Sequence, residues 1–394
     1  MKKYVFNILA FSTLLFLVSS PLHVFRVARV SPEVPLYFFY ISWPLLAIAI
    51  VPLALIGFRH APVKWYFPIF VICLYSPVLS LYNLHDTVGF MGNVMRLVVC
   101  LSFIIVGVNY FRFVSSYYID NTVFIAKASF VSGGLALVMM YVLYFVFNAS
   151  VYFGLQVTIL FIPLAYYLVT RRFSLSLLVL VLIVLAGKRG TILAGLMIYI
   201  FYMFFLQERN RRFVGTVKWI FLCFLIVGFI YIFDLMPSFI QNRLDMIIIS
   251  GQEIGDTAYG SRFSEMEFIL SYFKQNPMFL IFGTGLGSVV DKGDGVFVST
   301  VHFSPLAILY RFGVVGVVLV YGFFTVLICR YLSRRKRMSR DTRALSDTWI
   351  LTLIGELMFS FTAFTILQSI VLWLSVAIIL SSLLVQKNLE RFQI

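Results

Sequence analysis

Charged residues are scarce in this sequence. Of its 394 residues, 12% are charged and 61% are hydrophobic. A soluble domain of this composition could not hydrate its surface, which excludes the soluble globular classes. Apolar runs suited to membrane helices lie near residues 4–20, 36–58, 65–82, 94–111, 123–147, 151–169, 173–187, 190–206, 217–236, 303–329, 347–364 and 366–385. We therefore expect an all-α integral membrane protein, one polytopic bundle over residues 1–394 with about twelve transmembrane helices.

Several motifs that would indicate other functions are missing. The four cysteines all lie inside apolar runs and offer neither a disulfide framework nor a metal cluster: Cys73, Cys100, Cys223 and Cys329. No Gly-x-x-x-x-Gly-Lys-Ser/Thr loop occurs, so nucleotide hydrolysis is not expected. No pair of carboxylates stands out for glycosidase chemistry, and no repeat period is visible. We expect no metal ion and no cofactor.

The basic residues predict the orientation in the membrane. The first apolar run follows Lys2 and Lys3, and we expect it to be retained because Pro21 would follow a cleavage after Ser20. With both termini in the cytoplasm, about two thirds of the 31 lysine and arginine residues lie inside. The net charge of +15 is thus a signal for orientation and lipid headgroups, and no nucleic-acid partner is expected.

This orientation places the long polar interval 237–301 outside the cytoplasm as one large loop. An amphipathic helix is predicted over 260–273, because apolar residues recur there at helical spacing. The predicted buried stripe is Met266, Ile269, Leu270 and Phe273. Arg262 lies one turn ahead on that stripe, so its guanidinium is expected to point toward the membrane part. Asn276-Pro277 is expected to end the helix.

Three further motifs flank the predicted membrane helices. Gly283-Thr-Gly285-Leu-Gly287 is a segment in which backbone can approach a ligand closely, and His302 precedes an apolar run that contains Gly313 and Gly316. The turn Gly187-Lys188-Arg189-Gly190 joins two short runs of about 22 and 25 Å, against a hydrocarbon core of about 30 Å. Lys188 and Arg189 are therefore expected to be recessed, which a polar cavity, local thinning of the bilayer or snorkelling would allow.

In this order, the motifs resemble the shared region of the O-antigen polymerase and O-antigen ligase family. The resemblance consists of an arginine that opens a loop helix, an Asn-Pro, a Gly-x-Gly-x-Gly, a histidine at the mouth of the next membrane helix, and a Gly-x-x-Gly. A second patch is Gly187–Gly190. Ligases of this family usually place Asn directly after the histidine. Phe303 takes that position here, which favours a polymerase over a ligase.

The resemblance implies a bundle similar to glycosyltransferases of the GT-C type. It also implies transfer of glycan from undecaprenyl diphosphate at the outer face of the bacterial inner membrane. We expect an O-antigen, capsule or exopolysaccharide polymerase that uses a lipid-linked repeat unit as acceptor. The alternatives are a ligase that transfers glycan to lipid A core and, in another class, a lipid-linked oligosaccharide flippase. A chain-length regulator and a flippase are further candidate partners, besides the lipid-linked oligosaccharide and the bilayer.

The expected site residues follow from this chemistry. Arg189 and Arg262, assisted by Lys188, would bind the donor diphosphate, because guanidinium groups bind phosphate in bidentate fashion. His302 would take the proton of the acceptor hydroxyl, because histidine titrates near neutrality.

The remaining candidates have structural alternatives. Gly283, Gly285 and Gly287 could donate backbone N–H groups to the anion. Glu265 is a further candidate and could instead pair with Arg262. Arg311 is expected to face away from His302 on a regular helix, and there either to neutralise Glu356 or to line the cavity. The two glycines Gly313 and Gly316 are expected to allow close helix packing beneath the histidine.

Overall fold

The computed structural model describes Asn7 and residues 46–58, 63–81, 86–109, 117–147, 155–186, 189–207, 258–291, 297–298, 301, 303–363, 366–367 and 369–392. The predicted run near 217–236 lies outside these residues, as do nearly all of the run near 4–20 and the first part of the large loop.

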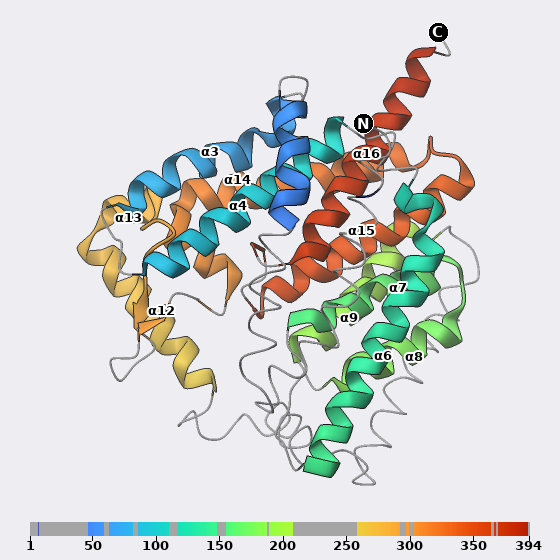
Figure 1. Cartoon of the computed structure of the whole chain (residues 1–394), viewed down its shortest axis with the longest axis horizontal. Helices are drawn as coiled ribbons and strands as arrows, with labels where there is room; N and C mark the ends of the chain where they lie inside the picture. The colour runs from blue at the N-terminus through green and yellow to red at the C-terminus, as the bar shows by residue number, and fades with distance from the viewer. Residues whose placement is uncertain are drawn as a thin grey trace.

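Almost all of the described residues are helical (Figure 1). After a short helix at Leu46–Gly57, the order is α3 (Val63–Ser80), α4 (Thr87–Asn109), α6 (Thr122–Phe147), η2 (Leu155–Leu160), α7 (Phe161–Val169), α8 (Phe173–Leu185), α9 (Arg189–Phe201) and η3 (Tyr202–Leu206). The loop contributes α12 (Ala258–Gln275), α13 (Pro277–Phe282), β1 (Val290–Asp291) and β2 (Phe297–Val298), the two strands pairing antiparallel. The chain then forms α14 (Ser304–Arg335), α15 (Arg340–Ser360) and α16 (Ile370–Phe392).

Each predicted apolar run within the described residues coincides with a helix. Within these residues three helical segments are long and apolar enough to cross a membrane: Gly89–Asn109, Thr122–Leu143 and Ser304–Arg335. Shorter apolar helices accompany them. Boundaries differ at several ends, and α4 begins at Thr87 instead of near residue 94. The total of twelve spans and the likeness to GT-C enzymes stay predictions.

Two groups of helices form the bundle (Figure 1). In one, α3 and α4 pack together with α14, which also packs on α13; in the other, α15 packs on α7 and α9, and α8 joins them. Helix α16 connects the groups because it contacts both α4 and α15. A Cβ on Gly107 would lie 2.7 Å from Ala377 Cα, so α4 and α16 touch backbone to backbone. Such close contacts are how membrane helices associate without a hydrophobic driving force between them.

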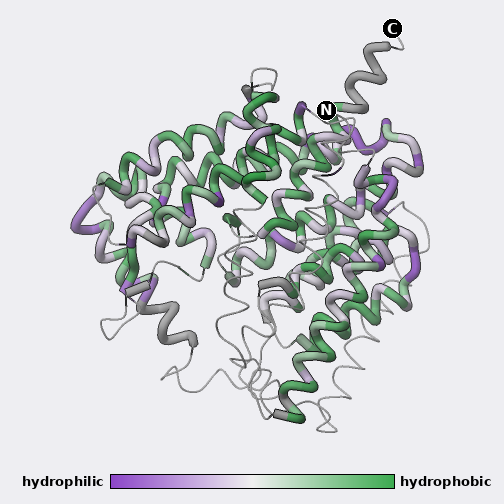
Figure 2. The backbone as a smooth tube through the Cα atoms, in the orientation of Figure 1, coloured by the Kyte–Doolittle hydropathy of each residue, from purple (hydrophilic) through white to green (hydrophobic). Residues whose placement is uncertain are grey.

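The outer surface of the bundle is apolar. Hydrophobic residues run along the helices, while hydrophilic residues gather at their ends (Figure 2). Large side chains that a soluble protein would bury are exposed, among them Leu55 at 70%, Phe145 at 69% and Val318 at 63%. Exposed apolar area on this scale marks contact with lipid. The fold is that of a multi-pass membrane protein.

Candidate functional site

The structure describes the expected site residues unevenly. His302 and Lys188 lie outside the described residues, and for Arg189 and Arg262 only the helical backbone is described. Their chain neighbours therefore define where the candidate site lies.

Two of these neighbourhoods meet at the residues that directly follow α15. A Cβ on Gly190 would lie 2.5 Å from Thr362 Cβ, so the first turn of α9 rests directly against that side chain. Ser304, the first residue of α14, donates its hydroxyl proton to the carbonyl of Ala363 at 2.8 Å, and both are buried. We call residues 361–363, which follow α15, the α15 turn. The N-termini of α9 and α14 thus meet at the α15 turn.

Aromatic packing closes one side of this junction. The ring of Phe303 lies 6.3 Å from that of Phe361, centroid to centroid, and the Tyr321 ring lies 6.2 Å from Phe361. Phe303 occupies the position where family ligases carry Asn. In this structure it therefore contributes an apolar contact and cannot offer an amide to a substrate.

A carboxylate lies beneath the junction. Glu356, on α15, is fully buried, and among the described residues neither of its carboxylate oxygens makes a hydrogen bond. The hydroxyls of Thr158 and Ser369 face it but do not reach hydrogen-bond geometry. Glu356 lies about 6 Å along the helix axis from Ser360, the last residue of α15. An ionisable group within a membrane helix is expensive, and a functional role is the default explanation. In the sequence, Glu356 stands out only as a lone acidic residue in an apolar run.

Arg311 does not neutralise Glu356, contrary to one expectation. Arg311 is 1% exposed, and no hydrogen bond joins it to Glu356. The charged groups that act on Arg311 are Arg96 of α4 and Asp86, just before α4. Arg311 therefore belongs to the group formed by α3, α4, α13 and α14.

The glycine segment packs against a break in α14. Gly283 and Gly285 have φ of +82° and +90°, and Gly313, inside α14, has non-helical φ of +66°. A Cβ on Gly283 would overlap the Arg311 carbonyl, and one on Gly313 would lie 2.5 Å from Phe282 N. The predicted continuous face from His302 through Gly313 and Gly316 is therefore interrupted, because α14 is not regular there.

The N–H groups of residues 283–286 donate to other groups of the protein. Gly283 N–H donates to Phe279 O at 2.7 Å, and Gly285 N–H to Arg311 O at 3.0 Å. Thr284 N–H donates to Tyr310 O at 2.8 Å, and Leu286 N–H donates to Ser80 Oγ at 2.6 Å. The carbonyl of Gly287 accepts a hydrogen bond from Asp86 N–H at 3.2 Å. In this structure the Gly283 and Gly285 N–H groups therefore bind carbonyls of the protein, and both residues allow close packing of backbone on backbone. A role in binding the anion stays a prediction.

The amphipathic helix forms as predicted, but with a different buried face. Helix α12 ends at Gln275 and α13 begins at Pro277, as the Asn-Pro indicated. Its inner face carries Glu265, Ile269 and Phe273, which are 1%, 0% and 5% exposed. Ile269 and Phe273 are thus buried as predicted. Met266 and Leu270, expected inside, are 47% and 44% exposed, so the buried face is rotated toward Glu265.

Position 262 lies on the buried face of α12 in spite of this rotation. It precedes Glu265 by three residues and Ile269 by seven, so it shares the face of α12 on which these two lie. The C-terminal end of α12 is fixed on α14, because the rings of Tyr272 and Phe273 lie 6.0 and 6.2 Å from that of Tyr310. Burial raises the pKa of the Tyr272 phenol, which keeps it neutral as a packing group. Within the described residues, no group of three or more histidine, cysteine or acidic side chains could hold a metal ion.

The break in α14 gives a first test. Gly313→Ala should lower the thermal midpoint of the purified protein by several degrees, because a left-handed backbone costs a non-glycine residue about 1–2 kcal/mol and the new methyl meets α13. Gly322→Ala, in the same helix, is the matched control, since nothing lies within 4 Å of its Cβ position. Equal midpoints for the two variants would show that α14 is regular at Gly313.

The contact between α9 and the α15 turn gives a second test. Gly190→Ala should destabilise the protein by about 1–3 kcal/mol, because its methyl overlaps Thr362. Thr362→Gly removes that obstacle but also the hydrogen bond to Phe359 O, worth about 1 kcal/mol. In a double-mutant cycle followed by thermal unfolding, the double variant should resemble Thr362→Gly alone. Strict additivity of the two effects would contradict the contact.

The comparison with known families agrees with these elements. Residues 174–321 match the family model described as O-antigen ligase. The match begins in α8 and ends in α14, so it includes the turn before Gly190, α12, the glycine segment and the start of α14. A comparison with curated proteins gives no match. The resemblance predicted from the motifs is therefore confirmed: over residues 174–321 the chain is similar to the O-antigen ligase family.

Proposed function

We propose that this protein is a polysaccharide polymerase. It would transfer a growing glycan from undecaprenyl diphosphate to a lipid-linked repeat unit at the outer face of the bacterial cytoplasmic membrane. The family match supports the coarser statement, a polymerase or ligase of polysaccharide. Phe303 supports the finer one, because the ligase pattern has an amide at that position.

The main support for this proposal is that the N-termini of α9 and α14 meet at the α15 turn. Arg189 is the residue before Gly190, and His302 lies two residues before Ser304. Gly190 and Ser304 both contact the α15 turn, and from their nearness in sequence we infer that an arginine and a histidine serve one site beside this turn.

The chemistry needs few groups. The acceptor hydroxyl oxygen attacks the anomeric carbon of the donor sugar while the bond from that carbon to the diphosphate oxygen breaks. His302 takes the hydroxyl proton, a contribution of about 10²- to 10⁴-fold in rate. Arg189, Arg262 and Lys188 stabilise the charge that develops on the leaving diphosphate, so no general acid is needed.

Glu356 joins this proposal as a positioning residue. A buried carboxylate beneath a cluster of cations balances part of their charge when no donor is bound. Its removal should therefore affect the site more than the fold, because replacing a buried ionisable group by a neutral one of the same shape is often neutral or stabilising.

The variant Glu356→Gln tests this role. We expect an unchanged or higher thermal midpoint together with at least tenfold less polymer in cells that lack the native protein. Thr158→Val, which removes a hydroxyl facing the same carboxylate, is the control and should leave most activity. Full polymer from Glu356→Gln would reduce Glu356 to a packing residue.

A ligase is the second candidate, favoured by the description of the matching family model. A ligase uses the same donor and hands the glycan to lipid A core. Deletion distinguishes the two functions, because cells without a ligase accumulate long polymer on the lipid carrier, whereas cells without a polymerase accumulate single repeats. The flippase, the third alternative, lacks support from the family match.

The catalytic assignment has its own test in the same cells. His302→Ala, Arg189→Ala and Arg262→Ala should each collapse the ladder of chain lengths on a gel to single repeats. Arg330→Ala is the matched control, because Arg330 lies at the other end of α14, 4.8 Å over the Trp65 ring. Near-normal polymer from His302→Ala would remove histidine from the catalytic role.

A further inference from the structure

An apolar elbow lies beside the break in α14. We define the elbow as residues 266–282, which comprise most of α12 and the whole of α13. Every residue of α13 except Phe279 is exposed, and the side chain of Met278 is 67% exposed. An apolar surface that covers a whole helix marks a site of interaction with a partner or with a membrane.

The part of α12 within the elbow has three faces. The buried stripe includes Glu265, and the next stripe around the helix consists of Met266 and Leu270, which are exposed. The stripe after that is exposed and polar, with Glu267 and Ser271. Because each residue advances a helix by about 100°, the three stripes follow one another around α12. A protein-facing side, then an apolar side, then a polar side is the order expected of a helix that lies at a membrane surface.

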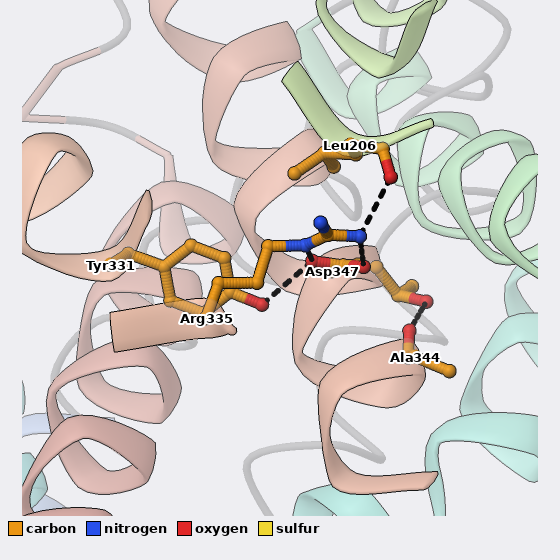
Figure 3. A network of polar contacts seen from close by, with 6 residues as sticks. Leu206, Tyr331, Arg335, Ala344 and Asp347 are labelled. Atoms are coloured by element: carbon orange, nitrogen blue, oxygen red, sulfur yellow. Dashed lines mark hydrogen bonds and ion pairs between the residues drawn. The ribbon is translucent and has the colours of Figure 1, made fainter. Parts of the chain in front are cut away.

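The break in α14 indicates how deep the elbow lies. From Val314 to Arg335 the helix is about 33 Å long, which matches one crossing of a hydrocarbon core of about 30 Å. The far end of this segment is charged, because Arg335 Nε and Nη2 donate to the two carboxylate oxygens of Asp347 at 2.7 Å each (Figure 3). Ionisable groups are costly inside hydrocarbon, so this end lies at one boundary of the membrane. Gly313 therefore lies at the opposite boundary.

Helix α13 contacts α14 at that boundary. A Cβ on Gly313 would overlap the carbonyl of Ile281, so the two backbones touch there. The ring of Phe279 lies 5.8 Å from that of Tyr272, which holds α13 against α12. Helix α12 runs across the direction of α3 and α4 (Figure 1). The elbow thus lies over the ends of the membrane helices, at the depth where acyl chains meet headgroups.

The elbow continues the lipid-facing surface of its two neighbours. Exposed apolar side chains line both of them: Leu74, Val78 and Leu81 on α3, and Val314 and Val318 on α14. The segment that follows α13 rests on the last turn of α3, because Leu286 N–H donates to Ser80 Oγ at 2.6 Å. Helix α13 therefore lies between two apolar surfaces that already face lipid.

We propose that the elbow is inserted in the leaflet at this end of the bundle. Its exposed apolar side chains lie among acyl chains, and the stripe of Glu267 and Ser271 faces water. Residues 266–282 are then an interfacial segment of the bundle instead of part of a loop outside the membrane. Because position 262 shares the buried face of α12, the anchored elbow also holds that position at the level of the headgroups. This insertion does not depend on the proposed function.

A photo-crosslinking residue tests what covers the elbow. The variant Met278→p-benzoyl-phenylalanine of the full chain is irradiated in the membranes of cells that produce it, and mass spectrometry identifies the products. The same replacement of Val318, on the lipid-facing side of α14, is the positive control, and that of Glu267 is the negative control. We expect lipid adducts from positions 278 and 318 in similar yield and several-fold less from position 267.

Other products would overturn the proposal. A cross-link from position 278 to a second copy, to another protein or to another part of this chain, in place of lipid, would identify a different occupant. Absence of any lipid adduct at position 278, with adducts formed at position 318, would mean that water covers the elbow.

Spin labels measure the depth independently. The four native cysteines are replaced by alanine, and a nitroxide is attached to Met278→Cys, Glu267→Cys or Val318→Cys in vesicles of phosphatidylcholine and phosphatidylglycerol. Oxygen concentrates in hydrocarbon, whereas a nickel chelate stays in water. The ratio of collisions with oxygen to collisions with nickel should be several-fold higher at position 278 than at 267, and close to that at 318. Equal ratios at positions 278 and 267 would contradict insertion.

Discussion

The contact between α9 and α15 is the constraint on which the candidate site depends. In lipid, apolar surfaces do not drive helices together, so small residues that allow close approach decide which helices pair. Gly190 lies against Thr362 at one end of this pair, and a Cβ on Gly355 would lie 2.6 Å from Ile198 Cδ1 further along. The hydrogen bond from Ser304 then fixes the start of α14 on the same turn. Two segments that are far apart in sequence are thereby held at one point.

The buried polar residues divide the bundle into regions with different tasks. Glu356 lies beneath the α15 turn and makes no hydrogen bond to the part of the chain that the structure describes, whereas Arg311 interacts with charges around α4. At the other end, Arg335 and Asp347 form a bidentate pair that holds α14, α15 and η3 together. The buried carboxylate of Glu356 near the α15 turn suits a site whose net charge changes when a charged substrate binds. The Arg335–Asp347 pair, whose charges are satisfied by protein groups, stabilises the fold.

The sequence predicted the helices well and their contacts poorly. Composition and apolar runs were sufficient for α3 to α9 and α14 to α16, and the Asn-Pro fixed the end of α12. The periodicity of apolar residues predicts only half of the buried face of α12: Ile269 and Phe273 are buried, but the third buried position, 265, holds a glutamate. Gly283 and Gly285 were read as ligand-binding, since a local motif does not show that Arg311 and Ser80 already accept their N–H groups or those of their neighbours. The contact between Gly190 and Thr362 cannot be predicted from the sequence around either residue, because the two are far apart along the chain.

We propose that the cations and the histidine share one site beside the α15 turn. A cryo-electron microscopy map of the protein with undecaprenyl diphosphate bound would show whether they do. We expect diphosphate density between Arg189 and Arg262, with the His302 imidazole facing the position of the anomeric carbon and residues 361–363 forming the adjacent wall. Diphosphate bound elsewhere, or these three residues separated by tens of ångströms with no shared cavity, would contradict it.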